Sequence, residues 1–568
     1  MQKFRNKETL KHTINMYTEF DHYFVRLQNS INKHWDSDAL CDYRGKSMTF
    51  GQMATSIAQI HTFFETAGIK KEDHIALCAK NCASWALSFI SVASYETVVV
   101  PILVDFKPDS IQKLVTHSDS IMLMTDNDTW KKLDINAMPG LKAVINIENT
   151  ELLYRNDEAI KTAHDNLVEN FKAKYPEGLK KEDVKALLPT DNMDKLSVIN
   201  YTSGSTGDPK GVMLTHRSLS AGIDYGHRHI PVYPGDHMVS MLPMAHIYGL
   251  AFEFLYPLSG GATIHYLGKS PSPTLLLQAM KDVRPYLICT VPLVMEKIYK
   301  ASLKPVLSKP VMKVLTKIPG LNMIIFNKVR EKLDGAFGGR VREYVMGGAP
   351  LNPEVEDCFR KIKLHYTVGY GMTEASPLLA YASWKTYAKR SCGRSVDCGD
   401  ARIDSADPTK IVGEIQAIGP NICIGYYKNE KATKELFTED RYIHTGDLGL
   451  IDKDGNIFIK GRSKNMILSA NGQNIYPEEV EAVVNNQEYV AESVVVDRDT
   501  KLVALVYLNP DTMKRDGIGY EQIETVRNNI LNGANESLPV YSKIAKVELR
   551  DEPFEKTPKM SIKRFLYS

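Results

Sequence analysis

The most informative segment of the chain reads Tyr201-Thr202-Ser203-Gly204-Ser205-Thr206-Gly207-Asp208-Pro209-Lys210-Gly211, directly after the β-rich run Ser197-Val198-Ile199-Asn200. From Thr202 to Gly211 it contains four hydroxyl side chains, three glycines and one lysine. Glycines let backbone N–H groups approach phosphate oxygens, hydroxyls donate hydrogen bonds and lysine supplies charge. The Walker pattern G-x-x-x-x-G-K-[ST] has no match here. The segment therefore predicts a polyphosphate-binding loop of another kind, with a polar linker as the alternative.

Around this loop, short β-rich runs alternate with helical patterns. Before it, residues 74–78 and 97–104 are β-rich and flank a helical pattern near residues 82–95. After it come short apolar runs bounded by glycine or proline, at residues 238–242, 262–267, 286–290 and 344–346. Alternation of this kind requires right-handed crossovers and a parallel sheet covered on both faces. The sequence predicts an α/β fold with two related α/β layers.

From about residue 412 strands dominate, and residues 449–451 and 457–459 are joined across an Asp-Gly pair that is typical of a hairpin. After Gly461-Arg462-Ser463-Lys464 the pattern restarts as helix, strands, helix and strand. We expect a large N-terminal domain over residues 1–461 with a β-rich subdomain, and a small mobile α+β domain over residues 462–568. The hinge is expected near residues 462–464.

Two further motifs follow β-rich runs. Tyr370-Gly371-Met372-Thr373-Glu374 combines an aromatic plane, a glycine, a hydroxyl and a carboxylate, which suits a base, a phosphate and a divalent ion. The alternative is a helix start capped by Thr373. Gly347-Gly348-Ala349-Pro350 is compatible with the edge of a nucleotide site or with a simple chain reversal.

At these motifs the sequence resembles the acyl-adenylate-forming superfamily, and it is most similar to long-chain fatty acid–CoA ligases. Besides the three motifs above, the resemblance includes Tyr442-Ile443-His444-Thr445-Gly446-Asp447 and the region from Gly461-Arg462-Ser463-Lys464-Asn465 to Asn474-Ile475-Tyr476-Pro477-Glu478-Glu479-Val480-Glu481. The matches occur in order, which is far more specific than any single motif.

The resemblance implies roles for individual residues. It implies that Tyr370 stacks on adenine, Thr373 contacts the α-phosphate, Glu374 ligates Mg²⁺ and Asp447 accepts the ribose hydroxyls, although Gly-Asp alone is an ordinary turn. Arg462 is similar to the arginine that reaches ribose and phosphate, and Lys464 occupies the pivot position. The full set expected to bind ATP or AMP is Thr202, Ser203, Gly204, Ser205, Thr206, Gly207, Lys210, Gly348, Ala349, Pro350, Tyr370, Gly371, Thr373, Asp447 and Arg462.

The sequence departs from the family at its C-terminus. The family has a catalytic lysine three residues after a proline, but Thr557-Pro558-Lys559-Met560-Ser561-Ile562-Lys563-Arg564 places Ser561 there. A neutral hydroxyl cannot supply the charge that an ammonium gives to the transition state. In an extended segment Lys559, Ser561 and Lys563 share one face. We hypothesise that Lys559 or Lys563 is the catalytic lysine, and the rival is a protein that binds adenylate with impaired adenylation.

Two other regions are candidates for function. Pro243-Met244-Ala245-His246-Ile247-Tyr248-Gly249 resembles the family region that borders the acyl pocket, with His246 as a catalytic candidate and a structural histidine as the alternative. Residues 297–332 are basic with interleaved apolar side chains, and they are similar to a helical insertion of long-chain ligases. Anionic lipid, the phosphates of CoA and a merely solvated face all remain open for this region.

Composition excludes several classes of protein. The 568 residues carry 70 Lys and Arg against 68 Asp and Glu, a net charge of +2 that argues against a nucleic-acid binder. The hydrophobic share of 43% and the charged share of 24% exclude a wholly disordered chain. The eight cysteines show no C-x-x-C or zinc spacing, which favours free thiols. With no secretory signal and no run of about 20 apolar residues, we expect a cytoplasmic protein, with the basic region as the candidate for peripheral membrane contact.

Together these observations predict an AMP-forming acyl-CoA synthetase with ATP, Mg²⁺ and CoA as substrates and cofactor. A fatty acid of medium or long chain is the expected acid, and the resemblance implies that it is first adenylated and then transferred to CoA. The alternatives are an aryl or short-chain acid, a carrier protein in place of CoA, or the adenylate-binding protein that Ser561 suggests.

Overall fold

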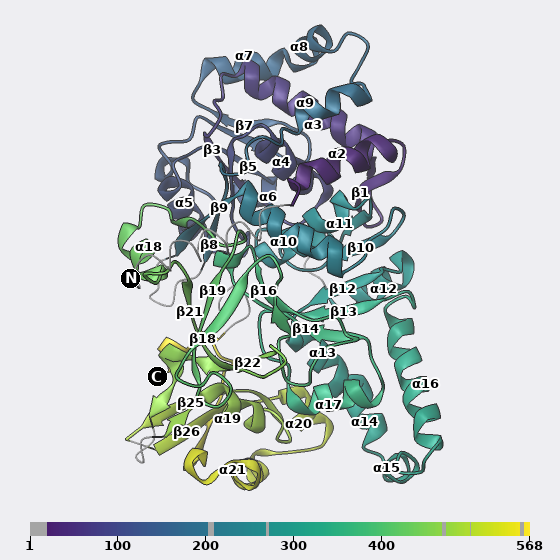
Figure 1. The fold of residues 1–568 in the computed structure, drawn as a ribbon, viewed down its shortest axis with the longest axis vertical. Coiled ribbons are helices and arrows are strands. Elements are labelled where there is room, and N and C mark those ends of the chain that lie inside the picture. Colours follow the sequence, from purple (N-terminus) through teal and green to yellow (C-terminus); the bar gives the residue numbers. More distant parts are fainter. Residues whose placement is uncertain are drawn as a thin grey trace, which may run out of the picture.

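The computed structural model describes residues 20–202, 209–268, 272–468, 473–499, 501–556 and 562–567. The N-terminal domain is an α/β body with a β-rich part beside it, and a small α+β domain follows (Figure 1). This confirms the predicted fold class. The division at residues 461/462 stays a proposal.

The first layer is an eight-stranded sheet that is mainly parallel in its middle. Its spatial order is β20 (Gly425–Tyr426), β9 (Lys210–Thr215), β8 (Leu196–Thr202), β4 (Val98–Pro101), β3 (His74–Cys78), β5 (Ser120–Thr125), β6 (Ala143–Asn146) and β7 (Leu152–Arg155). The strands from β8 to β6 are parallel neighbours, while β7, β9 and β20 pair antiparallel. The expected runs at residues 74–78 and 97–104 are thus central strands.

Helices cover both faces of this sheet because its strands are apolar on both sides. Ile75 and Leu77 of β3 pack in one core cluster with α3 (Phe50–Thr66) and α4 (Ala83–Ser94). Ala76 and Cys78 face the opposite way and pack with α5 (Pro108–His117). Successive side chains of a strand point to opposite faces, so a continuous apolar run buries both. α10 (His216–His229) follows β9 and leads to the second layer.

The second layer contains two smaller sheets. One has the order β10 (His237–Ser240), β11 (Thr263–Tyr266), β1 (Asp38–Asp42) and β2 (Ser47–Thr49). The other is parallel, with the order β12 (Leu287–Thr290), β13 (Glu343–Met346) and β14 (Tyr366–Val368). The helices around them are α2 (Tyr23–Lys33), a π-helix (Gly249–Leu255), α11 (Tyr256–Ser259), α12 (Pro273–Val283) and α17 (Pro353–Lys361).

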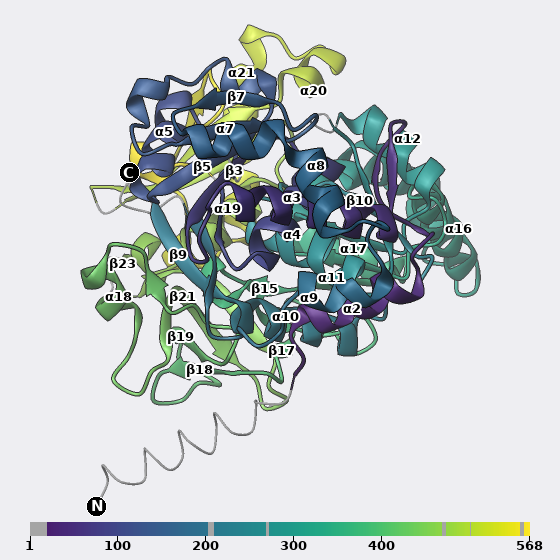
Figure 2. The ribbon, with the colours of Figure 1, turned by 90° about the horizontal axis from the view of Figure 1, so that it is seen from above.

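A helical arm extends from this layer between β12 and β13. It consists of α13 (Pro292–Ile298), a π-helix (Tyr299–Leu303), α14 (Lys304–Leu307), α15 (Pro310–Leu315) and α16 (Leu321–Ala336). α15 and α16 lie along the right-hand margin of Figure 1, and α16 is again at the margin in Figure 2. The remaining helices of the N-terminal domain are α6 (Asn127–Trp130), α7 (Glu158–Asp165), α8 (Leu167–Lys174), α9 (Val184–Leu187) and α18 (Glu430–Leu436).

The β-rich part confirms the expected hairpin. Its antiparallel sheet has the order β18 (Asp400–Asp404), β19 (Gly413–Ile418), β21 (Ile443–Ile451) and β22 (Ile457–Arg462), and β21 and β22 are joined across Asp452–Gly455. Gly455 has φ +83°, which a glycine adopts without strain. A smaller sheet contains β15 (Tyr370–Gly371), β16 (Leu378–Tyr381) and β17 (Arg394–Ser395). β22 continues to Arg462 and so reaches the expected hinge near residues 462–464.

The C-terminal unit has its own core, centred on side chains such as Val484, Ala504 and Ile530. Its elements are β23 (Ile467–Leu468), β24 (Asn474–Ile475), α19 (Pro477–Val484), β25 (Val490–Arg498), β26 (Lys501–Leu508), α20 (Pro510–Arg515), α21 (Ile523–Ser537) and β27 (Lys546–Arg550). β26 pairs antiparallel with β25 and parallel with β27. Within the described ranges, no helix is both long and apolar enough to cross a bilayer.

Candidate active site

The hydroxyl-rich loop connects two antiparallel strands. Thr202 ends β8 and is paired with Lys210, the first residue of β9. The prediction that this loop follows a strand is therefore confirmed, and β9, a strand that was not predicted, begins at Lys210. Ser203, Gly204, Ser205, Thr206 and Gly207 lie outside the described residues, so their phosphate-binding role stays a prediction.

Lys210 and Glu374 are linked through Tyr426. The Lys210 ammonium lies 4.9 Å from the centroid of the Tyr426 ring, within the range of a cation–π contact. The Tyr426 hydroxyl donates to Glu374 Oε1 at 2.8 Å. β20, which carries Tyr426, pairs with β9, which begins with Lys210. Three segments far apart in the sequence thus bring the predicted phosphate-binding lysine and the predicted metal ligand to one place.

The Gly-Gly-Ala-Pro turn lies where two parallel strands end. Gly347 follows β13 and Gly369 follows β14, and the Gly369 N–H donates to the carbonyl of Met346 at 2.8 Å. Gly348 has φ +87°, which a residue with a side chain rarely adopts. Gly348, Ala349 and Pro350 are exposed. The carboxyl ends of parallel strands are where α/β folds bind ligands, so this exposed turn suits a nucleotide edge.

Tyr370, Asp447 and Arg462 form one cluster, in which Tyr370 and Asp447 are buried and Arg462 is exposed. The Tyr370 hydroxyl donates to Asp447 Oδ2 at 2.8 Å, and Arg462 Nε lies 2.8 Å from Asp447 Oδ1. Tyr370 and Asp447 are each 6% exposed, whereas the Arg462 side chain is 60% exposed. Burial raises the pKa of Asp447, and Arg462 opposes that rise. Asp447 is not in a simple turn: it lies within β21, opposite Arg462 on β22.

Thr373 and Gly371 connect this cluster to Glu374. Thr373 is 5% exposed and begins a 3₁₀ turn, Thr373–Ala375, rather than capping a longer helix. A Cβ on Gly371 would lie 2.0 Å from the carbonyl oxygen of Pro377, so the backbone there leaves no room for a side chain. The residues from Tyr370 to Glu374 therefore run between the Asp447 cluster and the Glu374–Tyr426 pair.

The segment with His246 lies between the strand ends. Asn200 in β8 donates to the carbonyl of Ala245 at 2.9 Å, and the Tyr248 hydroxyl donates to the carbonyl of Val345 in β13 at 3.1 Å. A Cβ on Gly347 would meet the Tyr248 ring at 3.2 Å. His246 itself is half-buried, and its Nδ1 accepts from the Tyr248 N–H at 3.3 Å. A catalytic role for His246 stays a prediction.

Sequence reasoning missed two residues that fix this segment. Asn81 accepts from Met244 N–H at 3.0 Å and donates to the Leu242 carbonyl at 2.7 Å. Glu253, in the π-helix, accepts from Leu242 N–H at 2.7 Å. Glu253 is fully buried, and burial raises its pKa well above the usual range. A lone carboxylate within the apolar run 249–255 was the available signal.

The predicted pivot lies at the border between the two units. Lys464 is exposed in a 3₁₀ turn, Ser463–Asn465, directly after β22. Across the border, Lys300 Nζ donates to the Asn485 carbonyl at 3.1 Å and Asn352 Nδ2 donates to Asn486 Oδ1 at 2.6 Å. Lys460 Nζ, in β22, also donates to Glu479 Oε1 at 3.0 Å. These polar contacts connect α19 and the residues after it with β22, with the helical arm and with the segment after the Gly-Gly-Ala-Pro turn.

The C-terminal segment that departs from the family forms the base of a hairpin. Lys556 and Ile562 form an antiparallel bridge, while Lys559 and Ser561 lie outside the described residues. Lys563 Nζ donates to Glu555 Oε2 at 2.5 Å. The pKa of Glu555 is lowered first by that hydrogen bond, and Lys107 of the N-terminal domain contributes further. The base of the hairpin is thus within electrostatic reach of the large domain.

The residues present fit a magnesium ion held mainly by substrate. Glu374 is 9% exposed, and its Oε1 is held by Tyr426, which orients the carboxylate. Among the described residues there is no group of three His, Cys, Asp or Glu side chains that could hold a metal. Mg²⁺ is commonly bound by one or two carboxylates together with substrate phosphates, and a single oriented carboxylate meets that need.

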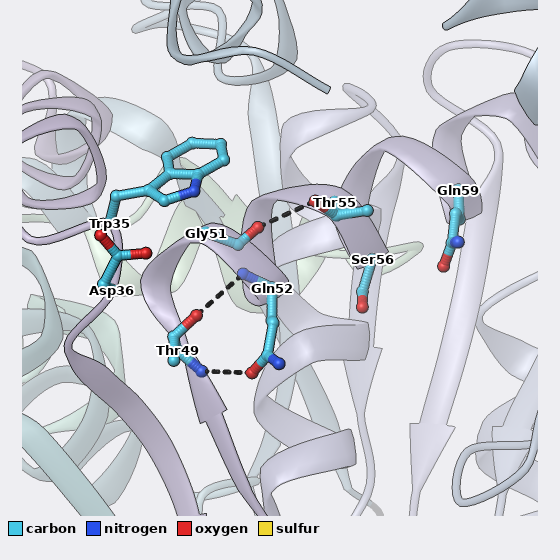
Figure 3. A pocket seen from close by; sticks show the side chains of 8 residues that line it. All are labelled: Trp35, Asp36, Thr49, Gly51, Gln52, Thr55, Ser56 and Gln59. Carbon is cyan, nitrogen blue, oxygen red and sulfur yellow. Dashed lines mark hydrogen bonds between the residues drawn. The ribbon is translucent and has the colours of Figure 1, made fainter. Parts of the chain in front are cut away.

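A separate surface pocket involves none of the predicted residues. Its volume is about 440 Å³, and it is lined by Trp35, Asp36, Thr49, Gly51, Gln52, Thr55, Ser56 and Gln59 (Figure 3). Thr49 caps α3 and exchanges hydrogen bonds with Gln52. This capping box explains why polar side chains gather here, since they satisfy the first N–H groups of the helix.

Comparison with solved structures defines the class of fold. ATP-bound MatB from Rhodopseudomonas palustris superposes with a TM-score of 0.75 and 19% identity, over 96% of this chain and 98% of that chain. The anthranilate CoA ligase AuaEII in complex with anthranoyl-AMP superposes with a TM-score of 0.77 and 16% identity, over 96% of both chains. The architecture is therefore that of the adenylate-forming enzymes.

Sequence comparison gives the family. A model of the AMP-binding enzyme matches residues 27–427, and a model of the AMP-binding enzyme C-terminal domain matches residues 464–567. The chain therefore belongs to the AMP-binding enzyme family. A similar curated protein is long chain acyl-CoA synthetase 6, peroxisomal, from Arabidopsis thaliana, 28% identical over 83% of this chain and 69% of that protein.

These findings confirm the predicted AMP-forming acid–thiol ligase, with ATP, Mg²⁺ and CoA as its substrates and cofactor. The acid and the roles of individual residues are not fixed by the family. Because the relatives include a peroxisomal protein, the cytoplasmic location also stays a prediction.

Proposed function

We propose that the enzyme activates a medium- or long-chain fatty acid as acyl-adenylate and then transfers the acyl group to CoA. The observation that carries the adenylation site is the continuous run from Tyr370 to Glu374, which joins the Asp447–Arg462 cluster to the Glu374–Tyr426–Lys210 group. This run connects Asp447, proposed to accept the ribose hydroxyls, and Tyr370, proposed to stack on adenine, with Lys210 and Glu374, proposed to act at the phosphates.

In the first half-reaction a carboxylate oxygen of the acid attacks the α-phosphorus of ATP. The P–O bond to pyrophosphate breaks, and acyl-adenylate and pyrophosphate are formed. We assign Asp447 and Arg462 to the ribose, Tyr370 to adenine, and Thr373 with Lys210 to the phosphates. Positioning and charge neutralisation supply most of the rate enhancement in phosphoryl-type transfers. Bound Mg²⁺, held by Glu374, neutralises phosphate charge.

The second half-reaction forms the thioester. The CoA thiol loses its proton to solvent, its sulfur attacks the acyl carbon, and AMP leaves with the electron pair of the broken C–O bond. Adenylation and thioester formation need different groups around one carbon, so we propose that residues 462–568 rotate about Lys464 between the steps. Among the described residues, the polar contacts across the border include those of Glu479, Asn485 and Asn486, and such a rotation would have to break them.

The fatty-acid assignment rests on curated relatives. Those compared include long chain acyl-CoA synthetase 6 of Arabidopsis thaliana, which covers 83% of this chain. The solved neighbours, including the anthranilate CoA ligase, are under 25% identical and support the fold alone. An aryl or short-chain acid is therefore the outcome that the test must separate from a fatty acid.

The test is detection of acyl-AMP by mass spectrometry, with purified protein, MgATP and a mixture of acids of graded chain length. We expect a long-chain acyl-AMP, followed by its consumption when CoA is added. Preference for acetate or an aromatic acid would overturn the fatty-acid assignment. Consumption of acyl-AMP only with a carrier protein that has a free thiol, and not with CoA, would overturn CoA as the acceptor.

A second candidate function is supported by Ser561 at the family lysine position. In it the protein binds acyl-adenylate but forms it poorly, since the loss of one catalytic group leaves binding largely intact. Tight binding of a synthetic acyl-AMP without pyrophosphate release from ATP would favour this function. Pyrophosphate release that depends on added acid would exclude it.

A further inference from the structure

The tip of the helical arm is an amphipathic surface that the adenylation site does not use. Six of the nineteen large apolar side chains that are exposed in the described residues lie between residues 306 and 324. They are Val306 (38% exposed), Val311 (67%), Val314 (62%), Ile318 (44%), Met323 (56%) and Ile324 (55%). We call residues 306–324 the arm tip. Such a concentration of exposed apolar side chains marks an interaction site.

These apolar side chains are not part of the core. α16 packs against the second core through Phe326, Val329 and Leu333, whereas Met323 and Ile324, about one turn earlier, are more than half exposed. α15 carries no buried residue. The arm is thus anchored at one end of α16, and its other end presents apolar surface that folding alone does not require.

The charge of the arm tip has one sign. From residue 301 to residue 330 the sequence contains no Asp or Glu, but it contains Lys304, Lys309, Lys313, Lys317, Lys328 and Arg330. Lys304 is paired with Glu354. Lys309, Lys313, Lys317 and Lys328 are exposed, and no carboxylate in the described part of the chain pairs with them. A solvated helical arm would ordinarily carry charges of both signs.

We propose that the arm tip docks on an anionic lipid surface. Lysines near a negatively charged membrane each contribute about 1 kcal/mol, and apolar side chains on the same short helices insert at the headgroup level. Lysine stems reach along the apolar surface while their ammonium groups stay at the phosphates. An acidic protein groove would complement the charge, but the six apolar side chains are exposed and belong to an arm at the margin of the ribbon (Figure 1), which suits a broad surface better than a groove. We infer that such docking delivers a lipid-soluble acid to the enzyme, and this part of the inference rests on the proposed function.

The test is co-sedimentation of the full chain with vesicles. Vesicles of equal parts phosphatidylcholine and phosphatidylglycerol are compared with vesicles of phosphatidylcholine alone, without ATP or acid. We expect binding to the anionic vesicles only, and weaker binding at high salt. The variant Lys309→Gln/Lys313→Gln/Lys317→Gln should lower the partition coefficient about a hundredfold. Val311→Ser/Val314→Ser should lower it about tenfold.

The matched control is Lys131→Gln/Lys172→Gln/Lys185→Gln, which removes three exposed lysines elsewhere and should leave vesicle binding unchanged. Both arm-tip variants should keep the wild-type rate of acyl-AMP formation from a soluble short fatty acid. Equal binding of control and arm-tip variants, or binding that CoA competes away, would overturn the proposal. So would self-association of the chain that the same variants abolish. If the chain bound vesicles but formed no acyl-AMP, the proposed function would be wrong and the docking proposal would stand.

Discussion

The adenylate cluster and the C-terminal hairpin differ in how firmly their charged groups are held. Tyr370 and Asp447 are buried and bonded to each other, and Glu374 is held by Tyr426. In the hairpin, Lys563 is paired with Glu555, whose side chain is 63% exposed. Exposed ion pairs contribute little and break easily. The nucleotide site is therefore preorganised, whereas Lys563, close to the altered lysine position, is free to exchange partners, although the next residue, Arg564, is anchored on buried Glu481.

This difference matches what the proposed mechanism requires of the two regions. Electrostatic catalysis is strongest where dipoles and charges are fixed before the reaction. A segment that approaches the site in one half-reaction and leaves in the next cannot be bonded tightly to it. Substitutions in each region therefore test whether the two regions differ in rigidity.

The largest effect is expected for Glu374→Gln. The amide keeps the shape and can still bond to Tyr426, but it lacks the charge that Mg²⁺ needs. We expect the rate of acid-dependent pyrophosphate release to fall about a thousandfold. Glu354→Gln, in the arm contact with Lys304, is the control and should stay near wild type. An unchanged rate for Glu374→Gln at saturating Mg²⁺ would remove Glu374 from the metal site.

The preorganised region was also the more predictable one from sequence. The strand before Thr202, the hairpin at Asp452–Gly455 and the α+β pattern of the small C-terminal unit all followed from local turn chemistry and periodicity. The hydroxyl, carboxylate and glycine content of Tyr370–Glu374 indicated a site from residue types alone.

The features that could not be predicted from the sequence depend on contacts between segments that are far apart in the chain. Tyr426 reaches Glu374 only because β20 joins the edge of the large sheet beside β9. Glu253 accepts a hydrogen bond from the Leu242 N–H because its carboxylate is buried within the π-helix. β22 ends at Arg462 because Arg462 pairs with Asp447 of β21. No local pattern encodes such pairings.

The second prediction concerns pH and the anchor of the C-terminal hairpin. Buried Glu481 contacts Arg564 and accepts from Val495 N–H at 2.6 Å. Burial raises the pKa of Glu481 to about 7, against the opposing effect of Arg564. The folded domain therefore binds this proton more tightly than the unfolded chain. Its stability should fall by about 3 kcal/mol as the pH rises from about 4.5 to about 7.

The measurement is hydrogen exchange of β25 in the full chain across this pH range, corrected for the intrinsic exchange rate. Glu481→Gln removes the titrating group, so its protection should lose this pH dependence. If wild type and Glu481→Gln show the same pH profile, Glu481 titrates normally and the anchor is charged throughout.

The third prediction addresses the substitute for the family lysine. Of Lys559→Ala and Lys563→Ala, the variant that removes the acting lysine should lower acid-dependent pyrophosphate release about a hundredfold, with little change in acyl-AMP binding. Lys543→Ala, an exposed lysine of the same domain, is the control. Wild-type rates for both variants would refute the rescue hypothesis. Ser561→Lys should then raise the rate if the chain merely lacks the charge.

The smallest effect should come from Tyr426→Phe, which keeps the ring beneath Lys210 and removes only the hydrogen bond to Glu374. One such bond contributes about 1 kcal/mol, so we expect a loss of up to tenfold, mainly as a higher Mg²⁺ requirement. Tyr427→Phe is a matched control, since its hydroxyl bonds to Asp119 at the surface. A higher Mg²⁺ requirement in Tyr426→Phe alone would show that Tyr426 acts by orienting Glu374. An equal loss in both variants would mean that the hydrogen bond to Glu374 has no specific role and that the site tolerates a mobile carboxylate. The difference in rigidity between the nucleotide site and the hairpin would then not hold at Glu374.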